Sequence, residues 1–78
     1  MRTFYEIHLT NGHKHIVSSD PCLMMGAWAT VTEYFGAWQA NDKRLCARKG
    51  AITIAPAHIV SYTTFEAQEV DADDRGAD

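Results

Sequence analysis

The chain has 78 residues, a formal net charge of −3, 46% hydrophobic residues and two cysteines. We expect a chain of this length to form one domain that buries only roughly 60% of its unfolded surface, so its margin of stability is thin. No apolar run approaches the roughly 20 residues of a membrane-spanning helix, and the pattern of a signal peptide is missing, so we expect a cytoplasmic protein with reduced thiols.

Charge is distributed unevenly along the chain. Residues 1–65 hold six bases and four acids, whereas the residues from Glu66 onward hold six acids and one base. The first part is therefore slightly basic and the second strongly acidic and poor in apolar residues. We predict one folded domain over residues 1–66 and an acidic, disordered tail over residues 67–78.

The first predicted element is a β-hairpin. The extended runs Thr3–Thr10 and His13–Ser18 flank Asn11 and Gly12, which form the strongest short-range hairpin signal. A two-residue turn would place His8 opposite His15. The alternation then predicts a core face of Tyr5, Ile7, Leu9 and Ile16 and an outer face of Phe4, Glu6, His8, His13, His15 and Val17.

Three histidines of the outer face form a candidate metal site. In the predicted register His8 and His15 are directly opposed, and His13 follows on the same face. Three imidazoles could hold zinc, nickel or copper, with Glu6 as a further oxygen ligand. The alternative interpretation is that these are ordinary polar side chains on the wet face of a hairpin.

A single helix is predicted over Pro21–Asn41. Asp20 is a suitable N-cap, Pro21 suits the first helical position, and Glu33 is the one charge in the stretch. Large side chains recur at helical spacing and would face the sheet, namely Met24, Trp28, Val31, Phe35 and Trp38.

The opposite side of that helix would present small residues around one charge. A face of this kind on a small protein indicates an interface, so we predict a protein partner and a homodimer; an alanine-rich face that is merely exposed is the alternative. Aromatic residues would anchor the partner, and arginines would steer an acidic one. The predicted partner-binding residues are Ala29, Glu33, Tyr34, Ala37, Trp38, Arg44 and Arg48.

A basic connector follows the predicted helix. Asn41–Gly50 contains Lys43, Arg44, Arg48 and Lys49, four of the seven bases of the chain. Such a cluster next to a tryptophan could contact phosphate and stack a base. The alternative function is therefore a nucleic-acid-binding regulator that uses the 43–49 loop.

Two final strands complete the predicted fold. Ala51–Ala55 and Ile59–Phe65 flank the turn Pro56–His58. The sum is a single α+β domain of order β-β-α-β-β, with a four-stranded, mostly antiparallel sheet and one helix packed on one face. If residues 27–35 form a strand instead, as their β-branched content allows, the chain resembles a small all-β barrel of the SH3 or Sm type.

No catalytic motif is present. The sequence has no Gly-rich phosphate loop, no His-Glu-x-x-His and no serine in a nucleophile elbow, so we predict a non-enzymatic interaction module with no required cofactor. It would act by covering a surface of a larger complex. Small domains with these properties resemble, in kind only, the inhibitors that phages and mobile elements use against host defence or regulatory complexes.

Overall fold

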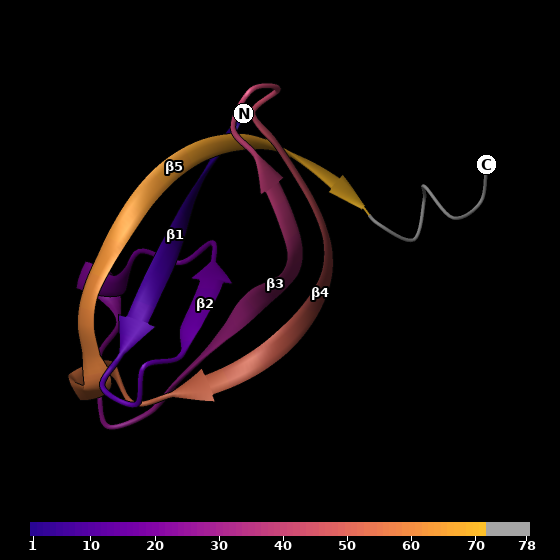
Figure 1. Cartoon of the computed structure of the whole chain (residues 1–78). Helices are drawn as coiled ribbons and strands as arrows, with labels where there is room; N and C mark the ends of the chain where they lie inside the picture. Colours follow the sequence, from indigo (N-terminus) through magenta and orange to yellow (C-terminus); the bar gives the residue numbers. More distant parts are fainter. Residues whose placement is uncertain (72–78) are drawn as a thin grey trace.

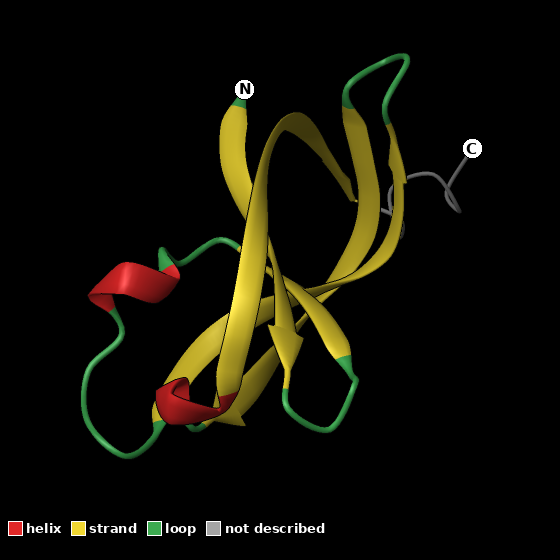
Figure 2. Ribbon diagram, turned by 60° about the vertical axis from the view of Figure 1, so that its left-hand side comes forward, coloured by secondary structure: helices red, strands yellow, loops and turns green. Residues whose placement is uncertain are grey.

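The computed structural model describes residues 1–71 and shows a closed five-stranded β-barrel (Figures 1 and 2). The strands are β1 (Arg2–Leu9), β2 (Lys14–Val17), β3 (Ala29–Gln39), β4 (Arg44–Ile54) and β5 (Ile59–Asp71). Neighbouring strands follow chain order around the barrel, and β5 returns to pair with β1. All neighbours are antiparallel except β4 and β5, which run parallel.

The predicted helix over Pro21–Asn41 does not form, and the predicted α+β class is therefore wrong. Only one 3-10 turn, η1 (Pro21–Leu23), forms at the predicted helix start, where the Asp20 carboxylate accepts from the backbone N–H of Cys22 at 2.9 Å. Gly26, with φ of +83°, then turns the backbone, and the β-branched residues that follow belong to β3. The all-β alternative agrees with the observed architecture.

The predicted first hairpin is confirmed, but its register differs by one residue. The N–H of Leu9 donates to the carbonyl of His13, so the loop has three residues and Gly12 takes a φ of +85°. This is the three-residue loop in which a left-handed glycine closes a type I turn. As a result His15 pairs with Ile7, and His8 pairs with Lys14.

The core is divided into two clusters on opposite faces of β1. Ile7, Val17 and Ile54 form one cluster, whereas Phe4 belongs to the other together with Tyr34, Leu45, Ala47 and Ala67. Phe4 and Ile7 are three residues apart, and alternation places them on opposite faces of the strand. Phe4 and Val17, predicted to face outward, are therefore completely buried.

The long strands β3 and β4 form a hairpin that curves away from the first strands, and β5 arches over it (Figure 1). The predicted basic connector 41–50 is thus mostly strand, because β4 begins at Arg44. The predicted turn at Pro56–His58 is confirmed as the 3-10 turn η2, directly before β5. β5 continues to Asp71, five residues beyond the predicted domain boundary, while residues 72–78 of the predicted tail lie outside the described part.

Within residues 1–71, no helix has the length and apolar character needed to cross a membrane.

Candidate functional site

A row of four aromatic rings leads from the core to the surface. Tyr34 packs edge-on against Phe4 at 5.0 Å between ring centroids, Phe4 stacks on Phe65 at 5.7 Å, and Phe65 packs on Trp38 at 4.5 Å. Tyr34 and Phe4 are buried, whereas Trp38 is 43% exposed. Each such pair contributes about 0.5–1.5 kcal/mol beyond area burial. The exposed indole of Trp38 therefore packs on a ring that is itself packed against the buried core.

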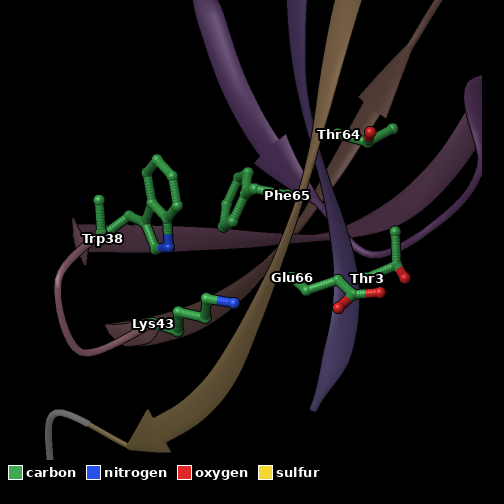
Figure 3. A pocket seen from close by; sticks show the side chains of 7 residues that line it. Thr3, Trp38, Lys43, Thr64, Phe65 and Glu66 are labelled. Carbon is green, nitrogen blue, oxygen red and sulfur yellow. The ribbon is translucent and has the colours of Figure 1, made fainter.

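Trp38 lines two hollows that share lining residues, and we name them together the Trp38 groove. The larger has a volume of about 480 Å³, and Figure 3 shows Lys43 extending toward Glu66 in its lining. The smaller has a volume of about 230 Å³. Both hollows are lined by Trp38, Thr64 and Phe65; the first adds Thr3, Ala40, Lys43 and Glu66, and the second adds Glu6, Ile16 and Thr63.

The β3–β4 hairpin positions Trp38 over β5. Gly36 makes this possible, because a Cβ at that position would lie 2.6 Å from the Cα of Ala47 on β4. The two backbones approach so closely that only glycine fits. At the hairpin turn Lys43 adopts a φ of +51°, and its carbonyl accepts from the N–H of Gln68 at 2.7 Å. This bond fastens the turn, and with it Trp38, to β5.

A charge cluster joins the strands β1, β4 and β5. The Glu69 carboxylate on β5 contacts Arg2 of β1 at 2.6 Å and Lys49 of β4 at 2.5 Å. The hydrogen bond from Lys49, followed by the charges of Lys49 and Arg2, lowers the pKa of Glu69 despite partial burial. The same carboxylate raises the pKa of the Lys49 ammonium. Two bases of this region are thus compensated by one acid.

The candidate metal residues are not brought together. His8 lies on the opposite face of the hairpin from His13 and His15, because of the one-residue change in register. His15 contacts Glu33 through Nδ1, and His8 contacts Glu6 at 3.2 Å. Within residues 1–71, no group of three or more histidine, cysteine or acidic side chains could hold a metal ion.

The predicted partner-binding residues fall into two groups. Ala37, Trp38, Arg44 and Arg48 are exposed on the β3–β4 hairpin. The others do not offer a contact surface of their own: Tyr34 and Glu33 are buried at 4% and 6% exposure, and Ala29 is half-buried. Trp38 is the one predicted residue that lines the groove.

Sequence reasoning missed the β5 side of the groove. Alternation placed Phe65 on one face of the last strand but did not say which face is covered. The pairing of Phe65 with Phe4 in the β1–β5 register decides that point, and it depends on strands far apart in the chain. No sequence pattern around Thr3, Thr64 or Glu66 marks these residues as part of a binding site.

A further hollow of about 410 Å³ lies beside η1 and the start of β5. There the Cys22 thiol and the Tyr62 hydroxyl are 2.9 Å apart, and this hydrogen bond raises the pKa of Tyr62. The contact fastens the η1 loop to β5.

Comparisons with known proteins give no guide to the function, because no family model, curated protein or solved structure matches this chain.

Proposed function

We propose that this protein is a non-enzymatic binding module that takes a segment of another protein into the Trp38 groove and thereby covers a surface of a larger complex. The observation that carries the proposal is the packing of Trp38, whose side chain is 43% exposed and whose ring lies tilted against Phe65 at 4.5 Å between centroids. Fixing a large aromatic side chain before binding reduces the entropy lost on association. A preorganised, half-exposed tryptophan is the residue type that dominates binding energy at protein interfaces.

The chemistry of the groove supports a protein segment as the ligand. Its lining combines two rings with the hydroxyls of Thr3 and Thr64 and with one ammonium and one carboxylate, from Lys43 and Glu66. Mixed polarity around an aromatic centre is typical of protein–protein contacts. A phosphate backbone would be repelled by the carboxylate.

The alternative function, nucleic-acid binding, loses part of its basis. The 43–49 segment is largely strand β4, and Lys49 is paired with Glu69. Glu66 stands within the same groove as Lys43. The local positive field is therefore smaller than the sequence predicts.

Self-association stays a prediction. It was derived from one side of a helix, and that helix is absent from the described residues. Ala29 and Ala37, which would have met the second copy, lie near opposite ends of β3.

The test is affinity capture with a matched pair of tryptophan variants. Full-length wild-type protein, Trp38→Ala and Trp28→Ala are immobilised, exposed to an extract of the native host, and compared for each retained protein by quantitative mass spectrometry. Both tryptophans are exposed, at 43% and 68%, but Trp28 lies outside the groove. We expect a protein retained by the wild type and by Trp28→Ala to be lost from Trp38→Ala.

Two outcomes would overturn the proposal. Either no protein distinguishes Trp38→Ala from Trp28→Ala, or the material lost with Trp38 is nucleic acid and disappears from the wild type after nuclease treatment. Thermal unfolding of both variants shows that each is folded before the capture is compared.

A further inference from the structure

The last residues of β5 form a distinct part of the barrel wall. β5 pairs with β1 as far as Ala67, and beyond that point it pairs with Arg44–Ala47 of β4 (Figure 1). We name Gln68–Asp71 the clasp, because this segment closes the barrel between β4 and β5. Within residues 1–71 it forms the one parallel ladder, and parallel pairs are slightly less stable per residue than antiparallel pairs.

Core packing contributes little to the clasp. Among residues 68–70, Gln68 is exposed, Val70 is half-buried, and neither belongs to a core cluster. The most deeply buried side chain of these three is that of Glu69, which is 18% exposed and ends in a carboxylate. A strand end without apolar anchors gains little from burial, so other interactions must hold it against β4.

Charges supply those interactions. Glu69 contacts Arg2 of β1 at 2.6 Å with one carboxylate oxygen and Lys49 of β4 at 2.5 Å with the other. The hydroxyl of Tyr34 on β3 completes the surroundings, since it accepts from Arg2 at 3.4 Å. The side chains of Arg2 and Lys49 are both 52% exposed, which leaves these contacts open to screening by dissolved ions.

Opening of the clasp would leave the remaining strands paired. The β1–β5 ladder ends before the clasp, and the β3–β4 ladder does not include it. The shorter β2–β3 ladder has no such freedom, because β2 is also paired with β1. Segments with few buried apolar contacts are the ones that open locally while the rest of a protein stays folded.

The clasp also holds the turn of the β3–β4 hairpin. The N–H of Gln68 donates to the carbonyl of Lys43 at 2.7 Å, and Lys43 lines the larger hollow of the Trp38 groove. Lys43 has a φ of +51°, a left-handed conformation that is costly for a residue with a side chain and that persists only where its surroundings fix it. When the clasp opens, the turn loses this bond to β5.

We propose that Gln68–Asp71 is a charge-held clasp that opens as a unit while the other strands stay paired, and that its opening frees the hairpin turn beside Trp38. The barrel then has a closed state, in which the groove is fixed, and an open state, in which the turn is released. This inference goes beyond the proposed function, because it concerns the chain alone and its test needs no partner.

The experiment is amide hydrogen exchange of the full-length protein under native conditions, followed by NMR. The amide of Gln68 reports on the clasp, and the slowest amides of the β1–β5 ladder report on the whole barrel. We expect Gln68 to be protected but to exchange about tenfold faster than the ladder, or more, after correction for intrinsic rates. Its exchange should also depend less on added urea, because opening four residues exposes little surface.

Two substitutions distinguish opening of the clasp from unfolding of the barrel. Glu69→Gln removes the charge contacts of the clasp and should raise exchange at Gln68 by about tenfold. Ile7→Val lies in the core cluster that includes no clasp neighbour, and should raise exchange severalfold in the β1–β5 ladder while leaving Gln68 unchanged. Asp42→Asn is the charge control, because it removes one acid from the exposed hairpin turn and should change exchange at Gln68 by less than about twofold.

The same spectra test release of the turn. The last pairs of the β3–β4 ladder, Trp38↔Leu45 and Gln39↔Arg44, lie next to it. If these pairs open only after the clasp, Glu69→Gln should raise their exchange by the same factor as at Gln68. Salt gives a comparison without a change at the clasp: about 1 M sodium chloride should speed exchange at Gln68 in the wild type and have little effect in Glu69→Gln.

Four results would overturn the proposal. If Ile7→Val raises exchange at Gln68 as much as in the β1–β5 ladder, the clasp opens only with the whole barrel. If Gln68 exchanges at its intrinsic rate in the wild type, the clasp is not closed at all. If Glu69→Gln has no more effect than Asp42→Asn, charges do not hold it. If the last β3–β4 pairs do not respond to Glu69→Gln, the clasp does not hold the turn.

Discussion

At the scale of single residues, Gly36 decides whether the hairpin can support the groove. A Cβ there would lie 2.6 Å from the Cα and 2.8 Å from the Cβ of Ala47, and these atoms belong to the paired strand and cannot move aside. We predict that Gly36→Ala lowers the free energy of unfolding by about 1–3 kcal/mol, the usual cost of overpacking, as measured by urea denaturation.

Gly50 is the natural control for that prediction. A Cβ at Gly50 would lie 2.8 Å from Cε2 of Phe35, the far end of an exposed ring that can turn away. Gly50→Ala should therefore change stability by no more than about 0.5 kcal/mol. Equal losses in the two variants would show that close approach of the backbones does not set the cost at Gly36.

Glu69 makes the stability of the barrel dependent on pH. Because Lys49 and Arg2 lower the pKa of Glu69, its ionised form is favoured by folding. Its contribution is complete above the unfolded carboxyl pKa of about 4.3 and is lost as the pH falls through the lower folded value. We predict that Glu69→Gln is less stable than the wild type at neutral pH, and that the difference closes in acid.

The measurement is urea denaturation of both proteins over a pH series. Glu66→Gln, an exposed position on the same strand, serves as the control and should remain within about 0.5 kcal/mol of the wild type throughout. A Glu69→Gln deficit that persists unchanged at the lowest pH would contradict the assigned role.

At the scale of elements, the junction between β2 and β3 is the weakest ladder in the barrel. It consists of the pairs Ile16↔Tyr34 and Val17↔Glu33, reinforced by the contact between His15 Nδ1 and the buried Glu33 carboxylate. Glu33→Ala leaves His15 without that partner and should cost about 1–3 kcal/mol. Glu33→Gln preserves the volume and a hydrogen-bonding oxygen, and should recover much of the loss.

Thermal and urea unfolding of these two variants provide the test. If Glu33→Ala were as stable as the wild type, the contact with His15 would not hold β2 against β3. If Glu33→Gln were as damaged as Glu33→Ala, the volume and oxygen that glutamine retains would not recover stability, and the charge would have to matter instead.

The failure of the helix prediction has a physical reason in the shape of β3. Val31 is half-buried against one core cluster, Tyr34 belongs to the other, and Glu33 between them is also buried, so burial along this strand does not alternate strictly. A strand that serves two cores loses its strict period of two and imitates helical spacing. The buried residues Phe4 and Ile7 of β1 are three residues apart. Local β-branched content was the more reliable signal here.

Turn chemistry was predicted better than register. The positions of Asn11 and Gly12, of the Asp20 cap and of the Pro56–His58 turn could all be read from local residue types. The loop length at Gly12 could not, because two- and three-residue loops share the same residues. The extra loop residue changes the register by one position and places His8 on the opposite face from His13 and His15, which removes the basis of the metal prediction.

At the scale of the whole molecule, the chain should show an all-β signature in solution. Strands account for most of residues 1–71, and the helical content is limited to the 3-10 turns η1 and η2. We predict a far-ultraviolet circular dichroism spectrum without the paired minima of α-helix. A strong helical spectrum would contradict the barrel and support the predicted helix.

The site could be predicted in part for the same reason as the fold. Trp38 stood out by residue type, since aromatic side chains dominate interfaces. Phe65 and the threonines became visible only when β5 was seen to lie beside β1 and across the hairpin. The groove forms only when β1 pairs with β5, and the local sequence of either strand does not encode that pairing.

The most direct test of the central claim is the fluorescence of Trp38 itself. In the Trp28→Phe variant, Trp38 is the remaining tryptophan, and binding of a captured partner should shift its emission to shorter wavelength as the indole leaves water. In the reciprocal Trp38→Phe variant, emission from Trp28 should not change. A partner that binds with full affinity and leaves Trp38 emission unaltered would contradict the account.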